Sequence, residues 1–348
     1  RSDHRSLLAR GHNPEGGPLM SRFSTFGNEL HSGQRSIPIV PRRKWWYLGS
    51  ALILVILAAI TGVRGVNWGI EFTGGSEFQI SHVKNPDQAL ARDVVREHVP
   101  SNEPRISQVG GNILRVQTEE LSTDATKALS ADLAKAYNVP AEDVSSSFVG
   151  PNWGGDVTAK AIQGIVIFML LVTIVMALYF RNFKSSVAAM AALTHDLLFT
   201  IVAYGAVGFE VTPATVIGFL TVLGYSLYDT VVVFDKVREN TEGFLERTDA
   251  SFATLVNRAT NQTLVRSINT SVVALLPVGS ILIIGAFILG AGTLKDISLA
   301  LFVGIIAGTY SSIFLAPSFL VDLRKGEKSI KDHTLRVERT HEKDVVTA

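Results

Sequence analysis

The sequence contains no cysteine among its 348 residues, and charged residues are scarce. Without cysteine the chain forms no disulfide, no thiolate metal site and no iron–sulfur cluster. Charged residues make up 18% of the chain and hydrophobic residues 47%, whereas soluble domains carry about 25% charged residues. The net charge of +1 indicates no nucleic-acid partner. This composition indicates a membrane protein.

Motifs of nucleotide-binding and hydrolytic enzymes are also missing. The sequence has no GxxxxGK[ST] loop, no strand–GxGxxG–helix unit, no HExxH and no GxSxG. We therefore predict that the protein is not an enzyme and needs neither a cofactor nor a metal ion. If the protein performs work, an ion gradient is the expected source of energy, because no ATP site is found in the sequence.

Long apolar runs dominate the sequence. Crossing a bilayer takes roughly 20 apolar residues, and six runs are long enough: Trp45–Val63, Ala161–Phe180, Val187–Phe209, Val211–Phe234, Thr263–Leu289 and Ile297–Val321. The first lies too far along the chain for a cleavable signal peptide. Met20 can be the initiator, with Arg1–Leu19 preceding it, and the sequence leaves this open. We expect a polytopic α-helical membrane protein with six transmembrane helices.

The lysine and arginine residues between the runs predict the orientation. Eight lie in the N-terminal arm 1–44, two in Arg181–Lys184, four in Asp235–Gln262 and seven in the tail from Arg324. Basic flanks mark the cytoplasmic side, so we expect a multi-pass protein of the cytoplasmic (inner) membrane with both termini in the cytoplasm. The expected division is an arm (1–44), a first transmembrane helix (45–63), an extracytoplasmic domain (64–156), a five-helix bundle (157–323) and a cytoplasmic tail (324–348).

The segment between the first two runs has the pattern of a small α+β domain. Its expected elements are strand Ser76–Ser81, helix Pro86–His98, strands Arg105–Gln108 and Asn112–Gln117, helix Thr123–Tyr137 and strand Val144–Val149. The order βαββαβ is that of the ferredoxin-like split motif. Because no polar cluster in it suggests catalysis, we interpret it as a binding or packing module. One span, one domain and five spans form a single repeat of the transporter type, which needs a partner.

Ionisable residues inside the apolar runs are the strongest functional signal. Asp229 lies roughly 8 Å from the cytoplasmic end of the fourth run. A bare carboxylate there costs about 2.5 kcal/mol or more, so it must be protonated, paired or hydrated. Arg266 has a similar depth in the fifth run, and consecutive helices are usually neighbours. We expect an Asp229–Arg266 pair that opens and closes as the acid takes up a proton; the alternative is a static salt bridge with Arg266 reaching for the interface.

Asp196 is a third candidate, about midway along the third run. His195 lies beside it, and histidine is the side chain that commonly serves as a proton carrier, but adjacent helical residues face different directions. A role of Asp196 in helix packing is equally compatible with the sequence.

Small and hydroxylic residues in the last two runs predict close helix contacts. Gly304-xxx-Gly308 permits close helix approach, and Ser267 and Ser271 belong to a polar run that favours interhelical hydrogen bonds. Thr270, one turn beyond Arg266, is a candidate for lining a proton path.

Five motifs together resemble the SecF family, in order and over about Trp45–Val321. They are Phe72-Thr73-Gly74-Gly75, Val149-Gly150-Pro151, Leu193-Thr194-His195-Asp196, Gly224-Tyr225-Ser226-Leu227-Tyr228-Asp229 and Asn261-Gln262-Thr263-Leu264-Val265-Arg266. By motif position the family's essential acid falls on Asp229 and its basic partner on Arg266. The family usually has Asn before that acid, where this chain has Tyr228, which alters the expected local geometry.

The resemblance implies a member of the resistance-nodulation-division superfamily. It implies partnership with SecD in a twelve-helix unit, association with the SecYEG translocon, and action on unfolded preproteins driven by protons, or by sodium in some members. Membrane lipids surround the spans. Two alternatives stay open: a proton-driven exporter of small molecules or lipids from the same superfamily, and a non-conducting scaffold for SecD. A single outer domain of ~90 residues argues against the exporter.

Overall fold

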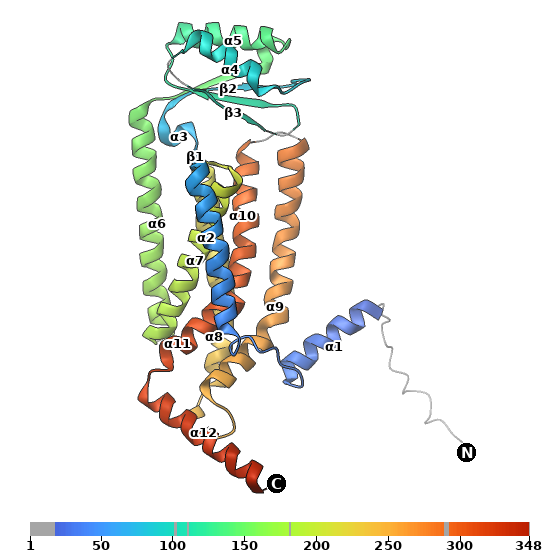
Figure 1. Cartoon of the computed structure of the whole chain (residues 1–348), viewed down its shortest axis with the longest axis vertical. Helices are drawn as coiled ribbons and strands as arrows, with labels where there is room; N and C mark the ends of the chain where they lie inside the picture. Colours follow the sequence, from blue (N-terminus) through green and yellow to red (C-terminus); the bar gives the residue numbers. More distant parts are fainter. Residues whose placement is uncertain (1–17, 101–102, 110, 181, 289–291, 348) are drawn as a thin grey trace, which may run out of the picture.

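The computed structural model describes residues 18–100, 103–109, 111–180, 182–288 and 292–347. It is elongated, with a helical bundle in the middle, a small α+β unit at one end and helices α1 and α12 at the other (Figure 1). Six helical stretches are long and apolar enough to cross a membrane: Arg43–Arg64, Asn152–Phe180, Phe183–Val207, Pro213–Glu246, Phe252–Gly285 and Leu294–Arg324. Each contains or overlaps one of the six predicted runs, which confirms that part of the predicted fold.

The first five bundle helices are longer than the matching apolar runs, and the sixth span is divided into two helices joined by a π-helical turn. The bundle helices are α2 (Arg43–Arg64), α6 (Pro151–Phe180), α7 (Phe183–Val207), α8 (Pro213–Asn240), α9 (Phe252–Ile281), α10 (Gly292–Tyr310) and α11 (Ala316–Arg324), with π-helical turns η3 (Leu282–Ile288) after α9 and η4 (Ser311–Leu315) after α10. Leu289, the predicted end of the fifth run, lies outside the described residues. N-terminal caps explain why α7 and α8 begin at different residues from the predicted runs. Asn182 accepts hydrogen bonds from the backbone of Lys184 and Ser185, and Thr212 forms a capping box before Pro213.

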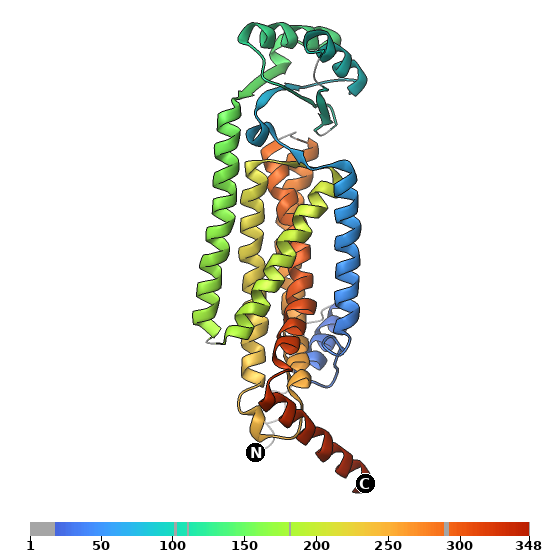
Figure 2. The same ribbon diagram turned by 60° about the vertical axis from the view of Figure 1, so that its left-hand side comes forward.

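Small residues bring the central helices together. A Cβ added to Gly304 would collide with the Val222 side chain, and one added to Gly308 would lie 2.8 Å from Ser226 Cβ. The contact between α10 and α8 therefore depends on these two glycines, as their spacing predicts. Helices α2 (blue) and α6 (green) flank the bundle on opposite sides (Figure 2).

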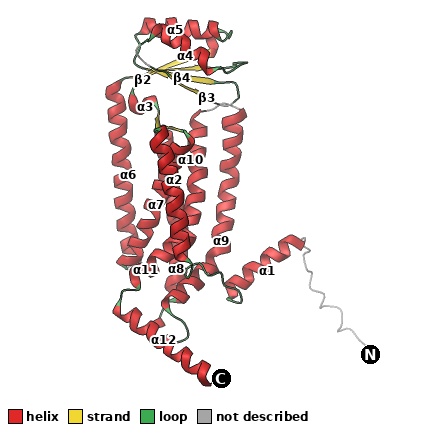
Figure 3. Cartoon of the chain, in the orientation of Figure 1, coloured by secondary structure: helices red, strands yellow, loops and turns green. Residues whose placement is uncertain are grey.

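The α+β unit contains one antiparallel sheet with two helices on one face (Figure 3). Its elements are β2 (Gly75–Ile80), α4 (Gln88–His98), β3 (Arg105–Gln108), β4 (Leu114–Thr118), α5 (Thr123–Ala136), the short 3-10 turn η1 (Ala141–Asp143) and β5 (Val144–Val149). The strand order is β3-β4-β2-β5, and Phe78 lies opposite both Val116 and Ser146. The fully buried Phe78, Leu129 and Leu133 belong to the core of the unit. Gly110, part of the predicted hairpin signal, lies outside the described residues.

A short two-stranded sheet connects the first span to the third. Strand β1 (Asn67–Trp68) pairs in parallel with β6 (Glu210–Val211), so the residues after α2 are tied to those after α7. Helix α3 (Ile70–Thr73) follows β1 and leads directly into β2. These connections hold the sheet above one end of the bundle (Figure 1).

At the opposite end, the chain before α2 is bound to the side of α9. Helix α1 (Pro18–Ser32) contacts α9, and the segment after α1 is held by two buried asparagines. Asn261 Oδ1 accepts from the Ile37 amide at 2.7 Å, and Asn257 Oδ1 accepts from the Val40 amide at 3.0 Å. Helix α12 (Lys328–Thr347) contacts the 3-10 turn η2 (Phe244–Glu246).

Replacing Asn257 by Ala is expected to release this segment, because the buried Val40 N–H loses its acceptor. An unsatisfied buried donor costs about 1–3 kcal/mol. Hydrogen exchange at the Val40 amide should accelerate, and trypsin should cleave the segment faster. Asn269→Ala, at an exposed position of the same helix, is the control and should change neither. Unaltered exchange at Val40 in Asn257→Ala would contradict the anchoring role.

Candidate functional site

Asp229 is buried in the middle of the bundle and is bound by hydroxyl groups. Its side chain is 5% exposed. Ser267 Oγ on α9 donates to Oδ1 at 2.7 Å, and Ser312 Oγ on η4 donates to Oδ2 at 2.5 Å. Asp229 therefore joins α8 to both following spans. Within the described residues no cation lies within ion-pair distance of it, so its charge, when present, is stabilised by neutral donors alone.

The expected direct pair between Asp229 and Arg266 is absent from the described part of this structure. Arg266 Nη2 instead donates to the Tyr228 hydroxyl at 3.3 Å. Successive helical residues point about 100° apart, so once Ser267 faces Asp229, Arg266 must face away. The same rotation turns Tyr228 outward, where it is 55% exposed. The residue that departs from the family pattern therefore contacts the predicted basic partner.

Asp196, on α7, is completely buried and has three side-chain partners. Ser226 Oγ and Ser311 Oγ donate to Oδ2 at 2.5 and 2.7 Å, and His195 Nδ1 lies 3.2 Å from Oδ1. The His195 ring bends back toward its neighbour despite the helical rotation between them. Its Nε2 lies 2.6 Å from Ser50 Oγ on α2. A continuous polar path thus runs from the first span to Asp196.

The two buried acids are linked through the π-helical turn η4. Its consecutive serines, Ser311 and Ser312, bind Asp196 and Asp229 respectively. On α8, Ser226 and Asp229 are three residues apart and share a face. Single π turns inside helices occur frequently at functional sites. Ser226, Ser311 and Ser312 are not predicted from the sequence as hydrogen-bond donors to the acids. A pair of serines inside an apolar run is the signal that points to Ser311 and Ser312.

Other predicted site residues lie around this core. Thr270 Oγ1 donates to the Arg266 carbonyl at 2.8 Å, which is a bond within its own helix. The Tyr225 hydroxyl donates to Ser271 Oγ at 3.5 Å, the limit of a hydrogen bond. Gly224 is exposed, and a Cβ there would have no neighbour within 4 Å. Tyr225 and Thr270 are partly buried, and neither side chain binds Asp229 or Asp196 in the described part of the chain.

The motif from Phe72 to Gly75 lies where the α+β unit meets the bundle. Gly74 has φ 73° and Gly75 φ 125°, conformations that side chains with a Cβ rarely adopt. A Cβ on Gly75 would collide with the Thr118 carbonyl, and one on Gly154 of α6 would lie 2.7 Å from the Phe72 carbonyl. Gly74 and Gly75 therefore allow the turn from α3 into β2, and Gly154 allows α6 to approach this turn closely.

The second motif of this kind, Gly150-Pro151, connects the sheet to α6. Pro151 is the first residue of α6, a position that suits proline. The Gly150 carbonyl accepts from the Gly154 amide at 3.3 Å in the first turn. Both motifs are thus connections between the α+β unit and the bundle.

A largely but not completely buried charged network lies beneath the sheet. Arg115 pairs with Glu210 and lies 3.4 Å from Glu77, and Gln117 donates to both carboxylates. Burial by itself lowers the pKa of the Arg115 guanidinium. The attraction of the Glu210 and Glu77 carboxylates is larger in sum, so the pKa is raised above its ordinary value. These contacts tie β2 and β4 to β6, and hence the α+β unit to the bundle.

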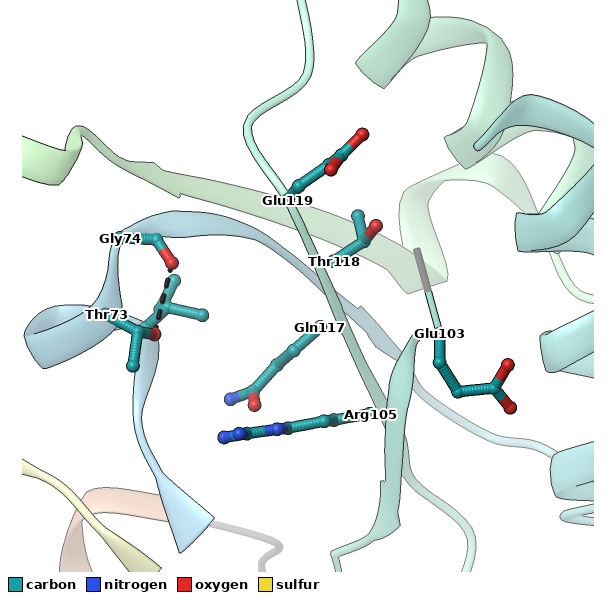
Figure 4. A pocket seen from close by; sticks show the side chains of 8 residues that line it. Thr73, Gly74, Glu103, Arg105, Gln117, Thr118 and Glu119 are labelled. Carbon is teal, nitrogen blue, oxygen red and sulfur yellow. Dashed lines mark hydrogen bonds between the residues drawn. The ribbon is translucent and has the colours of Figure 1, made fainter. Parts of the chain in front are cut away.

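A polar cavity of ≈ 220 Å³ adjoins this network. Figure 4 shows the Arg105 and Gln117 side chains side by side and directed toward Thr73, whereas Glu103 and Glu119 point elsewhere. Apart from Ile70, the lining consists of polar side chains and one glycine, so this part of the junction between the α+β unit and the bundle is polar.

Glu71 is expected to make this junction sensitive to pH. Burial, followed by repulsion from Glu210 and Glu77, raises the pKa of Glu71 above its ordinary value of 4.5. The protonated form therefore contributes stability that is present below the unfolded-state pKa and lost as the pH rises through the folded-state value. Glu71→Gln should raise the midpoint of thermal unfolding at pH 7 and change it little at pH 4. The exposed Glu119→Gln serves as the control; equal effects of Glu71→Gln at both pH values would contradict this assignment.

Comparison with known proteins gives one consistent family. Residues 129–326 match the family model described as "Protein export membrane protein SecD/SecF, C-terminal", and residues 59–81 match "SecD/SecF GG Motif". "Protein translocase subunit SecF" of Streptomyces coelicolor is 45% identical over 321 residues, which cover 91% of this chain and 85% of that protein. The protein of the same description from Mycobacterium tuberculosis is 40% identical, over 90% of this chain and 73% of that protein.

Among solved structures, the chain is similar to SecDF from Thermus thermophilus, described as a translocon-associated membrane protein. The TM-score is 0.75 at 28% identity, and the match covers 88% of this chain but 42% of the SecDF chain. This chain thus spans less than half of the SecDF chain that it matches. The predicted resemblance is confirmed: the chain belongs to the SecD/SecF family of protein export membrane proteins, as a multi-pass membrane protein with a SecF-like role in protein translocation.

Proposed function

We propose that the chain couples a proton gradient to protein translocation and that Asp229 carries the coupled proton. The observation that supports this is the environment of Asp229: a 5% exposed acid held by two serine hydroxyls. A buried ion without an opposite charge is costly, so proton uptake relieves the site. A neutral acid donates one hydrogen bond, whereas the ion only accepts. Protonation therefore changes the bonds between α8, α9 and η4.

The hydroxyl groups around the acid suit a relay. A serine hydroxyl donates one hydrogen bond and accepts others, so Ser312 and Ser311 can reorient between the two carboxylates. Asp196 belongs to the same relay as the second acid, connected through His195 toward the first span. Because one π turn contacts both acids, protonation of either alters the position of the sixth span.

Arg266 and Thr270 contribute to the relay from the exposed side of α9. In the conformation seen here, Arg266 binds Tyr228 rather than Asp229. Rotation of the long arginine side chain toward the acid would create the ion pair in a second state. We therefore propose two states, in which Arg266 binds the Tyr228 hydroxyl while Asp229 is protonated and binds Asp229 after the proton leaves.

The exposed face of α8 and α9 is the proposed docking surface for a SecD-like partner. It presents Tyr228 and Arg266 beside apolar side chains such as Ile217 and Val273, which are 59% and 67% exposed. The match covers 42% of a SecDF chain, and the larger remainder of that chain supports a separate SecD-like partner for this one. In this assembly the relay residues lie at the centre of a twelve-helix unit that acts with the SecYEG translocon on unfolded preproteins.

The remaining architecture is proposed as follows. The sheet order and the βαββαβ succession support a ferredoxin-like fold for the unit within 64–156, placed outside the cytoplasm. For the rest of the chain we propose an N-terminal arm (1–44), a first transmembrane helix (45–63), a five-helix bundle (157–323) and a C-terminal tail (324–348). The helices lie in the inner membrane, and both termini lie in the cytoplasm. The protein is a non-catalytic subunit.

The proposal is tested with this chain and its SecD partner reconstituted with SecYEG in vesicles. A preprotein is arrested partway through the translocon, a proton gradient is applied, and release of the preprotein is measured. A pH-sensitive dye records proton flux during release. We expect both signals with protons. Release by a sodium gradient alone would assign the coupling to sodium, and release without either gradient would favour the scaffold alternative. A bound lipid or drug in place of SecD and SecY after purification would favour the exporter.

A further inference from the structure

A cavity of ≈ 400 Å³ opens at the end of the bundle opposite the α+β unit. It lies between the beginning of α9, the end of α11 and the first half of α12. Its apolar lining residues are Phe252, Ala253, Val321, Ile330 and Leu335. Three of these, Phe252, Val321 and Ile330, are nearly completely buried, whereas Leu335 is 50% exposed. The cavity therefore has an apolar floor and an apolar side chain at its mouth.

Basic side chains surround this floor. Arg43, Lys325 and Lys331 line the cavity. Asp322 accepts from Arg43 Nε at 3.1 Å and from Lys325 Nζ at 2.8 Å, so one carboxylate serves two cations. Lys331 is exposed and enters no ion pair within the described residues. With Glu338 as the acid in the lining, the rim keeps an excess of positive charge.

The position of the cavity matches the boundary between hydrocarbon and water. Arg43 begins the first candidate span, and Val321 lies three residues before the end of the sixth. Trp45, two residues into the first span, is 72% exposed, and exposed tryptophans mark membrane interfaces. On α12, Lys331 and Leu335 are four residues apart and lie on the same face. That face therefore offers a cation and an apolar group to the same ligand.

We propose that this cavity binds one anionic phospholipid. An acyl chain lies on the apolar floor between Phe252 and Val321, and the phosphate is bound by Lys331 together with Lys325 and Arg43. Basic pockets between membrane helices at the cytoplasmic side suit anionic headgroups. A soluble phosphate would leave the floor unused, and a zwitterionic lipid would leave the excess positive charge uncompensated. The bound lipid would join α12 to the bundle, independently of the proposed proton relay.

The test measures lipid retention by the purified full chain in detergent micelles, using native mass spectrometry with dioleoyl phosphatidylglycerol or dioleoyl phosphatidylcholine. We expect one tightly retained phosphatidylglycerol and weaker retention of phosphatidylcholine. Lys331→Ala should weaken phosphatidylglycerol binding about fivefold, the effect of one basic group near anionic lipid, and leave phosphatidylcholine unaffected. Lys328→Ala removes the same charge from α12 outside the lining and should have no effect.

A second variant tests the apolar floor. Leu335→Ser, at a half-exposed position that tolerates a polar residue, should weaken retention of both lipids. Its unfolding midpoint in lipid-free micelles should match that of the unmodified chain. Equal retention of the two lipids, or equal losses in Lys331→Ala and Lys328→Ala, would overturn the proposal. Competition by soluble glycerophosphoglycerol at the lipid's own affinity would also overturn it, because the acyl chain would then contribute nothing.

Discussion

Asp229→Asn is expected to abolish the stimulation of protein export by a proton gradient. Asparagine has the same shape, so α8 keeps its packing, but the amide takes up no proton in the physiological range. A positioned proton-transfer group contributes about a hundredfold or more, so we expect the gradient-dependent rate to fall by at least about a hundredfold. Release of an arrested preprotein from reconstituted vesicles measures this rate, with and without the gradient.

The structure defines the matched control for this variant. Asp235 lies on the same helix, close to its C-terminal end, and accepts from the Tyr179 hydroxyl at 2.8 Å. Asp235→Asn makes the same chemical change outside the buried network and should leave export unchanged. In Asp229→Asn the new amide oxygen can still accept from one serine, but its NH₂ group requires the other serine to become the acceptor. Gradient-dependent export that survives Asp229→Asn at normal protein levels would reject the relay.

The buried acids can be found from the sequence because carboxylates inside apolar runs are costly and rare. Asp229 and Asp196 both stand out on that ground. The six spans and the strands and helices of the α+β unit also follow from local patterns, because hydrophobic periodicity and turn residues act within a few positions. Helix ends are less accessible: α7 begins at Phe183 because Asn182 caps it, four residues before the apolar run starts at Val187.

The partners of Asp229 could not be predicted, because side-chain direction depends on tertiary packing. Arg266 and Ser267 are adjacent in sequence and have similar depth, yet only one of them can face Asp229. A salt bridge was the reasonable expectation for an acid and a base on neighbouring helices. The structure instead brings Ser267 to the acid and adds Ser312 from a π turn. The hydropathy pattern does not reveal a π turn, so the hydrogen bond from Ser312 of the sixth span to Asp229 could not be predicted.

Gly304→Leu is expected to produce a large loss of stability in the bundle. Any Cβ at this position collides with Val222, whose branched side chain has little freedom to move. Overpacking of this kind costs about 1–3 kcal/mol. Separation of α10 from α8 would also draw Ser312 away from Asp229, so export should decline with stability. Thermal unfolding in detergent micelles, followed by circular dichroism, measures the first effect, and the vesicle assay measures the second.

Substitutions of two further glycines distinguish an effect on helix packing from an effect on the hydrogen bonds around the buried acids. Gly308→Ala adds one methyl group 2.8 Å from Ser226 Cβ, directly beside the Ser226 hydroxyl that donates to Asp196. We expect a smaller loss of stability than in Gly304→Leu but a clear loss of gradient-driven export. Gly224→Ala meets no atom within 4 Å and should be neutral or slightly stabilising in the isolated chain. If Gly304→Leu unfolds at the same temperature as Gly224→Ala, the close contact of α8 and α10 does not hold the bundle together, and the acids must be positioned by other helices.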